Sequence, residues 1–155
     1  MKPSENLKRL GIELPGPAAR GGLYAPVRVS GKLAFVSGQI PSKDGAVLMT
    51  GTLGKELSVE QGQTCAFQCA INTLAALDAH FEENGGLDAL RGCVKLFALV
   101  RSADDFTSQP LVANAASQLF IDVFGDEGWH ARSAVGVNAL PGGVPVEIES
   151  VFELV

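Results

Sequence analysis

The sequence has few of the residues on which metal and disulfide sites depend. It contains three cysteines and two histidines in 155 residues. Cys65, Cys69 and Cys93 cannot all pair, and they lie among apolar residues without a Cys-x-x-Cys spacing, which favours free core thiols in a reducing compartment. His80 and His130 are far apart in the chain and belong to no cysteine-histidine cluster, so we expect no bound metal.

Signals for nucleotides, membranes and nucleic acids are also missing. The glycine pairs match neither the dinucleotide fingerprint nor the P-loop, so we expect no nucleotide cofactor. No run of about 18 apolar residues is present for a membrane span, and the N-terminus resembles neither a secretion signal nor a transit peptide. The net charge of -5 opposes attraction to phosphate. These absences predict a cytoplasmic protein that binds neither membranes nor nucleic acid.

The size and composition that remain favour one folded domain. A chain of 155 residues, 46% hydrophobic and 19% charged, can bury a single core without disulfides or metal. Its hydrophobic content is slightly high for a monomer, which indicates that some apolar surface lies in a subunit interface. We therefore expect a single domain over residues 1–155, in an oligomer.

Hydrophobic periodicity predicts an alternation of strands and helices. Ser58 is placed to cap a long amphipathic helix, and Pro110 is tolerated near the start of a second one. The expected elements are two strands within 26–41 around a turn at Ser30-Gly31, a short edge strand within 45–54, a helix within 57–81, a strand at 93–100, a helix within 108–125 and a C-terminal hairpin at 129–154. This order predicts an α+β fold in which both helices cover one face of the sheet.

Charge in the two C-terminal strands is sorted by face. Side chains alternate between the two faces of a strand, so Arg132 and Asn138 share one face, which otherwise carries small residues. The last strand separates Glu147 and Glu149 from its apolar side chains in the same way. We expect these charged sides to form one polar sheet face opposite the helices. Packing that face against copies of itself in a closed oligomer suits its mixed character.

Several of these residues have the chemistry of a carboxylate site, although each has a plainer alternative. An arginine fork binds a carboxylate through two parallel hydrogen bonds and stays protonated, but Arg132 can instead form a salt bridge between subunits to Glu147, Glu149 or Glu153. Glu147 can orient water or accept a proton, or it can be an interface or solvent carboxylate. His130 shares the face of Arg132 and can donate a proton there, or it can simply begin the strand.

Three stretches resemble the Rid or YjgF family of enamine/imine deaminases, formerly called endoribonuclease L-PSP. They are "FVSGQIP" (35–41), the pair Asp105-Phe106 with "VAN" ending at Asn114, and "ARS" around Arg132 followed by "LP" and "VEIE" (146–149). Any one of these stretches is weak evidence for the family, but all three in the same order are a fairly specific signal. Residues 1–20, an N-terminal extension, and an insertion after residue 50 make this chain a longer sister branch.

The resemblance implies a chorismate-mutase-like homotrimer with a mixed sheet, two helices on one face and the other face forming a central barrel. It also implies three sites in the subunit clefts, where Arg132 binds the substrate carboxylate and Glu147 holds the hydrolytic water. The implied pocket-lining residues are Tyr24, Ser37, Gly38, Asn114 and Ala134. The family often has cysteine at the position of Ala134. Because alanine has no thiol, only the backbone of Ala134 can contribute to the pocket.

The implied reaction is hydrolysis of a small 2-imino or 2-enamino acid to a 2-oxo acid and ammonia. The implied ligand is thus a small carboxylate-bearing imine, enamine or 2-oxo acid. The alternative is a non-catalytic carboxylate-binding or chaperone-like module on the same fold. A ribonuclease is disfavoured by the acidic balance and by the lack of a histidine pair or a basic stripe.

The expected hairpin also predicts how the site is divided. If Gly142-Gly143 form a two-residue turn, Asn138 lies opposite Glu147 and Arg132 lies opposite Glu153. Six residues of strand then separate Arg132 from Glu147 by about 20 Å within one chain, too far for both to contact a small acid. We therefore expect a complete pocket to combine Arg132 of one subunit with Glu147 of its neighbour.

Overall fold

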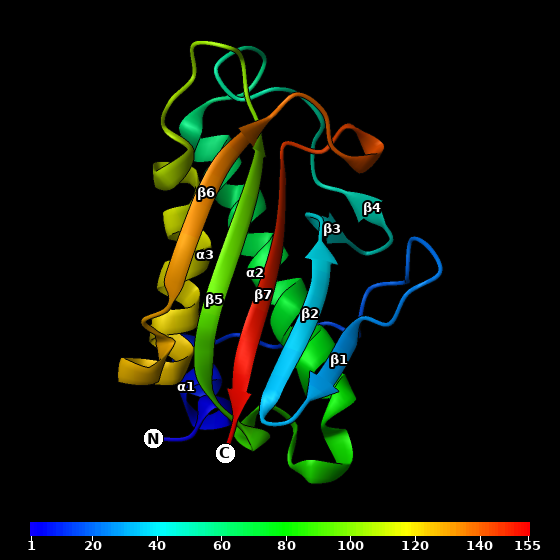
Figure 1. The fold of residues 1–155 in the computed structure, drawn as a ribbon, viewed down its shortest axis with the longest axis vertical. Helices are drawn as coiled ribbons and strands as arrows, with labels where there is room; N and C mark the ends of the chain where they lie inside the picture. Colours follow the sequence, from blue (N-terminus) through cyan, green and yellow to red (C-terminus); the bar gives the residue numbers. More distant parts are fainter.

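The computed structural model describes all residues 1–155 as a mixed five-stranded sheet with helices on one face (Figure 1). The strand order is β1-β2-β7-β5-β6. The main elements are α1 (Pro3–Leu10), β1 (Val27–Ser30), β2 (Leu33–Gln39), β3 (Ser42–Lys43), β4 (Ala46–Val47), α2 (Val59–His80), β5 (Leu90–Arg101), α3 (Gln109–Phe124), β6 (Ala131–Val137) and β7 (Val146–Leu154). Four short 3-10 helices lie between them: η1 (Glu82–Asn84), η2 (Gly86–Ala89), η3 (Gly125–Gly128) and η4 (Pro141–Gly143).

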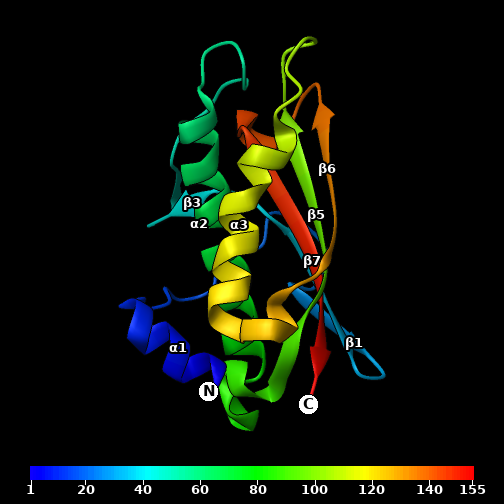
Figure 2. The same cartoon turned by 90° about the vertical axis from the view of Figure 1, so that its left-hand side faces the viewer.

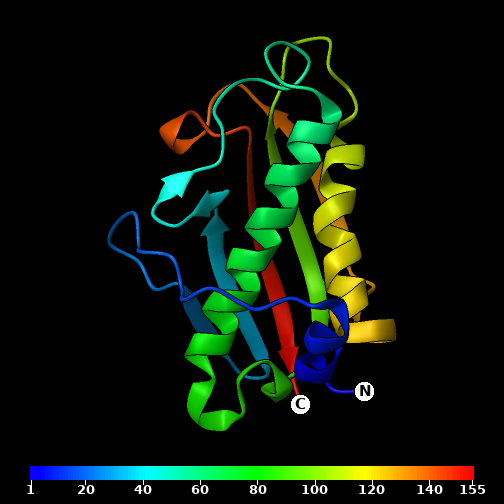
Figure 3. The ribbon, with the colours of Figure 1, turned by 180° about the vertical axis from the view of Figure 1, so that it is seen from behind.

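The two long helices that the hydrophobic periodicity predicts, α2 and α3, are confirmed. Ser58 caps α2: its hydroxyl accepts a hydrogen bond from the Gln61 backbone at 3.2 Å, while the Gln61 side chain accepts one from the Ser58 backbone at 2.9 Å. Helices α2 and α3 lie side by side over the same face of the sheet (Figures 2 and 3). Their apolar sides and that sheet face form one core, in which Phe120 and Phe152 are fully buried. A shorter helix, α1, packs at one end of this layer.

The N-terminal hairpin is also confirmed, with its turn one residue further along. Ser30 pairs with Leu33, so Gly31 and Lys32 form the two-residue turn. Gly31 has a φ of +59°, a conformation that favours glycine. The expected edge strand within 45–54 is different: β3 and β4 form a small separate sheet.

The three cysteines are free and buried, as their apolar neighbours predict. Burial raises the pKa of the Cys65 thiol to about 11 and that of Cys93 to about 12. Both thiols are therefore protonated at neutral pH and unreactive. None of the helices combines the length and hydrophobicity that a membrane crossing requires.

The expected C-terminal hairpin is wrong. Strand β5 lies between β6 and β7, runs parallel to β6 and runs antiparallel to β7. The reason is the helical crossover: β5, α3 and β6 form a βαβ unit, and such a crossover connects parallel neighbours. The turn at Gly142-Gly143 therefore carries the chain past the end of β5, and the expected pairs of Arg132 with Glu153 and Asn138 with Glu147 do not exist.

The expected common polar face is wrong for the same reason. Arg132 pairs with Leu96, whose side chain is fully buried under the helices, so Arg132 points to the helical side. Glu147 pairs with Leu99 and points to the open side of the sheet. The alternation along each strand is as expected, but Arg132 and Glu147 lie on opposite faces of the sheet.

The open face is nevertheless mixed in character, as expected. A shallow cavity of about 480 Å³ lies on it, with apolar side chains beside charged ones. Phe35 is 45% exposed there, next to Arg28, Lys95 and Glu149. Such a face is too apolar to be an ordinary solvent-exposed surface.

Candidate functional site

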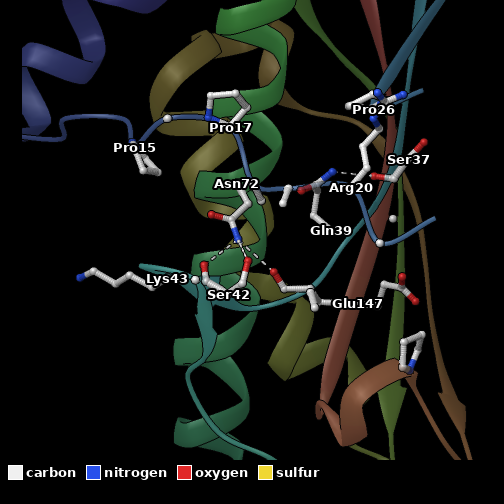
Figure 4. A pocket seen from close by; sticks show the side chains of 18 of the residues that line it. Pro15, Pro17, Arg20, Pro26, Ser37, Gln39, Ser42, Lys43, Asn72 and Glu147 are labelled. Atoms are coloured by element: carbon white, nitrogen blue, oxygen red, sulfur yellow. Dashed lines mark hydrogen bonds between the residues drawn. The ribbon is translucent and has the colours of Figure 1, made fainter. Parts of the chain in front are cut away.

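The expected site residues form two groups. Tyr24, Ser37, Gly38 and Glu147 line one cavity of about 670 Å³, between the end of β2, the start of β7 and the N-terminal segment 15–21 (Figure 4). Arg132, Asn114 and Ala134 lie instead on β6 and α3, at the opposite edge of the sheet. We call the first group the cavity half-site and the second the arginine half-site.

A β-bulge shapes the cavity half-site. Val36 pairs with Ser150 and Gln39 pairs with Ile148, so Ser37 and Gly38 together oppose a single residue of β7. A bulge bends the strand and interrupts its ladder of hydrogen bonds, which commonly occurs beside functional sites. Here it brings the backbone of Gly38 against the Glu147 carboxylate.

The absence of a side chain at Gly38 makes that approach possible. A Cβ atom built on Gly38 would lie 2.6 Å from Oε1 of Glu147 and 3.0 Å from its Cδ. Real Cβ contacts of this kind are not that short, so any larger residue would displace the carboxylate. Gly38 thus determines where the Glu147 carboxylate lies.

Glu147 has the properties of a base. It is half-buried on the cavity wall, and its carboxylate makes no hydrogen bond to another residue of the chain. Burial raises the pKa of its carboxyl, and the neighbouring charge of Glu149 raises it further. A carboxylate whose pKa is raised towards neutral accepts protons more readily and still ionises.

Ser37 and Tyr24 hold the cavity wall together. The Ser37 hydroxyl donates to the Ala25 carbonyl at 2.6 Å, and the Tyr24 hydroxyl accepts from the Gly21 backbone at 3.0 Å. Arg20 donates to the Tyr24 carbonyl at 3.1 Å. These bonds order the loop before β1. The Ser37 hydroxyl forms no hydrogen bond to a histidine or a carboxylate, so nothing activates it as a nucleophile.

Asn72 is a cavity residue that sequence reasoning missed. It lies in α2, is only 4% exposed, and donates to the carbonyls of Ile40 and Ser42, each at 2.9 Å (Figure 4). These bonds fix the chain where it leaves β2. The available signal was a polar amide in the otherwise apolar stretch "AINTLAAL" (70–77).

Arg132 of the arginine half-site has only neutral partners. Its Nη1 donates to Oδ1 of Asn114 at 2.8 Å and to Oγ of Ser117 at 3.1 Å, and its Nη2 lies 3.4 Å from the Pro110 carbonyl oxygen. The ion pairs of the chain are elsewhere, Lys2 with Asp88 and Arg91 with Glu153. Within the chain, therefore, Arg132 forms no salt bridge to a glutamate, and the expected alternative of such a bridge between subunits stays a prediction.

His130 belongs to the arginine half-site. Its Nε2 lies 2.9 Å from Oγ of Ser117, and its Nδ1 lies 2.7 Å from the Gly128 carbonyl oxygen. Burial lowers the pKa of His130, with the charge of Arg132 as a smaller cause in the same direction and the bond to Gly128 opposing both. Ser117, which links His130 to Arg132, was missed because a serine in a helix has no pattern of its own. Ala134 is half-buried and packs on the core beside them.

The two half-sites cannot form one pocket within the chain. On the strand ladders Arg132 is level with Ser150, three residues along β7 from Glu147, and β5 lies between the two strands. Three residues along and two strand spacings across put the two Cα atoms about 14 Å apart. The expected 20 Å came from the wrong hairpin register. The larger obstacle is that the side chains lie on opposite faces.

Comparisons with known proteins agree on one family. Residues 16–153 match the model of the family described as Endoribonuclease L-PSP. Protein TCP17 of Trypanosoma cruzi is 45% identical over 150 residues, covering 96% of this chain and 92% of the relative. Atu1372 of Agrobacterium tumefaciens, of unknown function, is 39% identical with a TM-score of 0.86, covering 98% of this chain and 91% of that one. A Shewanella oneidensis MR-1 structure, provisionally called an endoribonuclease, is 27% identical with a TM-score of 0.91, covering 99% and 100%.

Proposed function

Because the chain belongs to the Endoribonuclease L-PSP family, which is also the RidA/YjgF family, we propose that it hydrolyses a small 2-imino or 2-enamino acid to the 2-oxo acid and ammonia. The observation that carries this proposal is the state of Arg132. Its guanidinium is held by three neutral acceptors and by no carboxylate of its own chain. A half-buried, fixed and unpaired guanidinium is suited to a substrate carboxylate.

We propose further that the active protein is a homotrimer in which the two half-sites of neighbouring subunits meet. The arginine half-site lies on β6 at one edge of the sheet, and the cavity half-site lies beside β1 at the other edge. A head-to-tail ring that joins β6 of one subunit to β1 of the next completes a site at every interface. The mixed open faces then line a central barrel, which removes their apolar side chains from water.

In this arrangement the chemistry divides between the two subunits. Arg132 binds the substrate carboxylate and orients the imine carbon towards the cavity half-site. Glu147 of the neighbour orients a water molecule and takes its proton as the oxygen attacks that carbon. The same carboxyl then returns this proton to the nitrogen, which gives a carbinolamine. In the second step the carboxylate takes the carbinol O–H proton and passes it to the nitrogen, so the C=O bond forms as the C–N bond breaks, and ammonia and the 2-oxo acid leave. These substrates hydrolyse slowly without help, so orientation supplies a useful acceleration.

The test is competition between hydrolysis and trapping. 2-Iminopropionate is generated in situ by an amino-acid oxidase in the presence of semicarbazide, and the yield of semicarbazone is followed with and without the protein. The wild type should divert the imine to pyruvate before it is trapped. Arg132→Ala should lose this effect, while Arg91→Ala, which removes an arginine at an exposed ion pair, should retain it. No diversion by a folded trimer would refute the deaminase.

A second candidate is a non-catalytic module that binds a small carboxylate in the same cleft. The observation in its favour is E. coli TdcF, a structure of the same fold with bound serine, which is not an imine; it is 23% identical with a TM-score of 0.62. Such a module needs Arg132 but not Glu147. Glu147→Gln separates the two, because it should abolish imine hydrolysis in an enzyme and leave carboxylate binding intact in either case.

A further inference from the structure

His130, Ser117 and Arg132 form a hydrogen-bonded chain in which every donor and acceptor can be assigned. The Gly128 carbonyl can only accept, so the Nδ1 atom of His130, 2.7 Å away, carries a proton. In a neutral ring Nε2 is then an acceptor, and the Ser117 hydroxyl, 2.9 Å away, donates to it. That leaves the lone pairs of the Ser117 oxygen for the Arg132 guanidinium at 3.1 Å.

The direction of this chain matters for Arg132. A serine hydroxyl rotates freely and can point its proton at any acceptor. Here the neutral imidazole takes that proton, and the oxygen is thereby turned towards the guanidinium. Asn114 supplies the other fixed acceptor at 2.8 Å, so the two together orient Nη1.

We propose that His130 is a positioning residue that acts through Ser117 to hold the Arg132 guanidinium in its carboxylate-binding orientation, and that it releases this hold when the ring is protonated. The inference rests on the proposed function only in taking Arg132 as the group that binds the carboxylate. It assigns His130 no proton transfer to the substrate, since both ring nitrogens are engaged within the subunit.

Protonation of His130 reverses the hydrogen bond between His130 and Ser117. When Nε2 carries a proton it becomes a donor, so Ser117 faces two cationic donors and its own proton must turn to another acceptor. The charged group facing the ring is Arg132 of β6, which disfavours the protonated form. Helix α3 contributes neutral neighbours, Ser117 and the ring of Phe120, and η3 contributes the Gly128 carbonyl.

The sign of the pH dependence follows. The pKa of His130 is lowered from the ordinary value of 6.5, chiefly by burial. The ring is therefore neutral and the chain intact at pH 7, and the hold on Arg132 is lost as the pH falls below that ordinary value. KM for the imino acid should rise in this range, whereas loss of the Glu147 base at low pH should lower kcat.

The first test is spectroscopic; it compares the wild-type protein with Ser117→Ala and needs no substrate. The chain has two histidines, so long-range 1H–15N correlation resolves both rings. His130 should show the Nδ1–H tautomer, and Ser117→Ala should change its Nε2 shift while His80, exposed in α2, stays unchanged. An Nε2–H tautomer for His130 would overturn the assigned chain.

The second test is a double-mutant cycle in the trapping assay. Ser117→Ala and His130→Phe, which keeps a ring against Phe120, should each raise KM about fivefold, the worth of one ordinary hydrogen bond, with kcat changed less than about twofold. Because they break the same chain, the double variant should be no worse than either single one. His80→Phe is the matched control, and Ser117→Thr should restore KM since it keeps the hydroxyl.

The outcomes separate this inference from the proposed function. Kd values for 2-oxobutanoate, an unreactive carboxylate, are measured in parallel. Weaker binding in Ser117→Ala with no imine hydrolysis by the wild type would support the positioning role and refute the deaminase. Normal hydrolysis with an unchanged KM, or single effects that multiply in the double variant, would refute the positioning role alone. No carboxylate binding by the wild type would overturn both.

Discussion

Mixed trimers of two inactive variants test whether each site is shared between subunits. Arg132→Ala removes the arginine half-site of a subunit and leaves its cavity, whereas Glu147→Ala removes the base from the cavity and leaves the arginine. The two side chains lie on opposite faces of one sheet, with their Cα atoms about 14 Å apart by strand geometry. Neither variant should therefore be active alone, yet each carries the half that the other lacks.

The amount of activity recovered follows from the ring. In a trimer with two subunits of one kind and one of the other, the three interfaces differ, and only one joins an intact arginine to an intact Glu147 on the correct neighbour. Every mixed trimer therefore has about one third of the wild-type sites, whichever variant is in excess. A site built within one subunit would give no activity in any mixture.

The assay uses two different affinity tags on co-expressed variants. Two successive purifications leave only mixed trimers, whose mass is checked by light scattering before the semicarbazide competition is run. The matched control pairs Arg132→Ala with the double variant Arg132→Ala/Glu147→Ala, which assembles in the same way but has no intact arginine. Mixed trimers of the two single variants that are as inactive as this control would refute the shared site.

Four further predictions concern the cavity half-site and the charge of the protein. Gly38→Ala should lower kcat about 10- to 100-fold, because its Cβ would push the Glu147 carboxylate by roughly 1 Å; circular dichroism should show an unchanged fold, and full activity would contradict the close approach. The acidic limb of the kcat profile should lie above the ordinary carboxyl pKa of 4.5, since burial raises the pKa of Glu147. Glu149→Gln should move that limb to lower pH, while Glu153→Gln should not. Asn72→Ala should cost about 2 kcal/mol of unfolding free energy, measured by urea denaturation, because two carbonyls lose their donor; a loss below about 0.5 kcal/mol would show that the anchor is unimportant. Purified protein should not cleave RNA, given its charge of -5; nuclease activity that a point substitution abolishes would reverse this.

Local chemistry determined much of this protein from sequence alone. The 3.6-residue period and the Ser58 cap predicted α2, alternation predicted the β1–β2 hairpin, and apolar neighbours predicted buried thiols. These features depend on residues within a few positions of one another, so a single stretch contains the information. The family motifs likewise identified Arg132 and Glu147 as the residues to examine.

Only the tertiary structure decided which way the charged residues point. Alternation shows that Arg132 and Ala131 lie on opposite sides of their strand, but not which side turns to the helices. That choice follows from pairing with β5, distant in sequence and joined to β6 through α3. The same crossover brings Ser117 of the helix to His130 and Arg132 of the strand. Contacts between a strand and the helix that precedes it have no local period in the sequence. The sequence therefore predicted Arg132 as the carboxylate-binding residue but not the chain of hydrogen bonds that orients it.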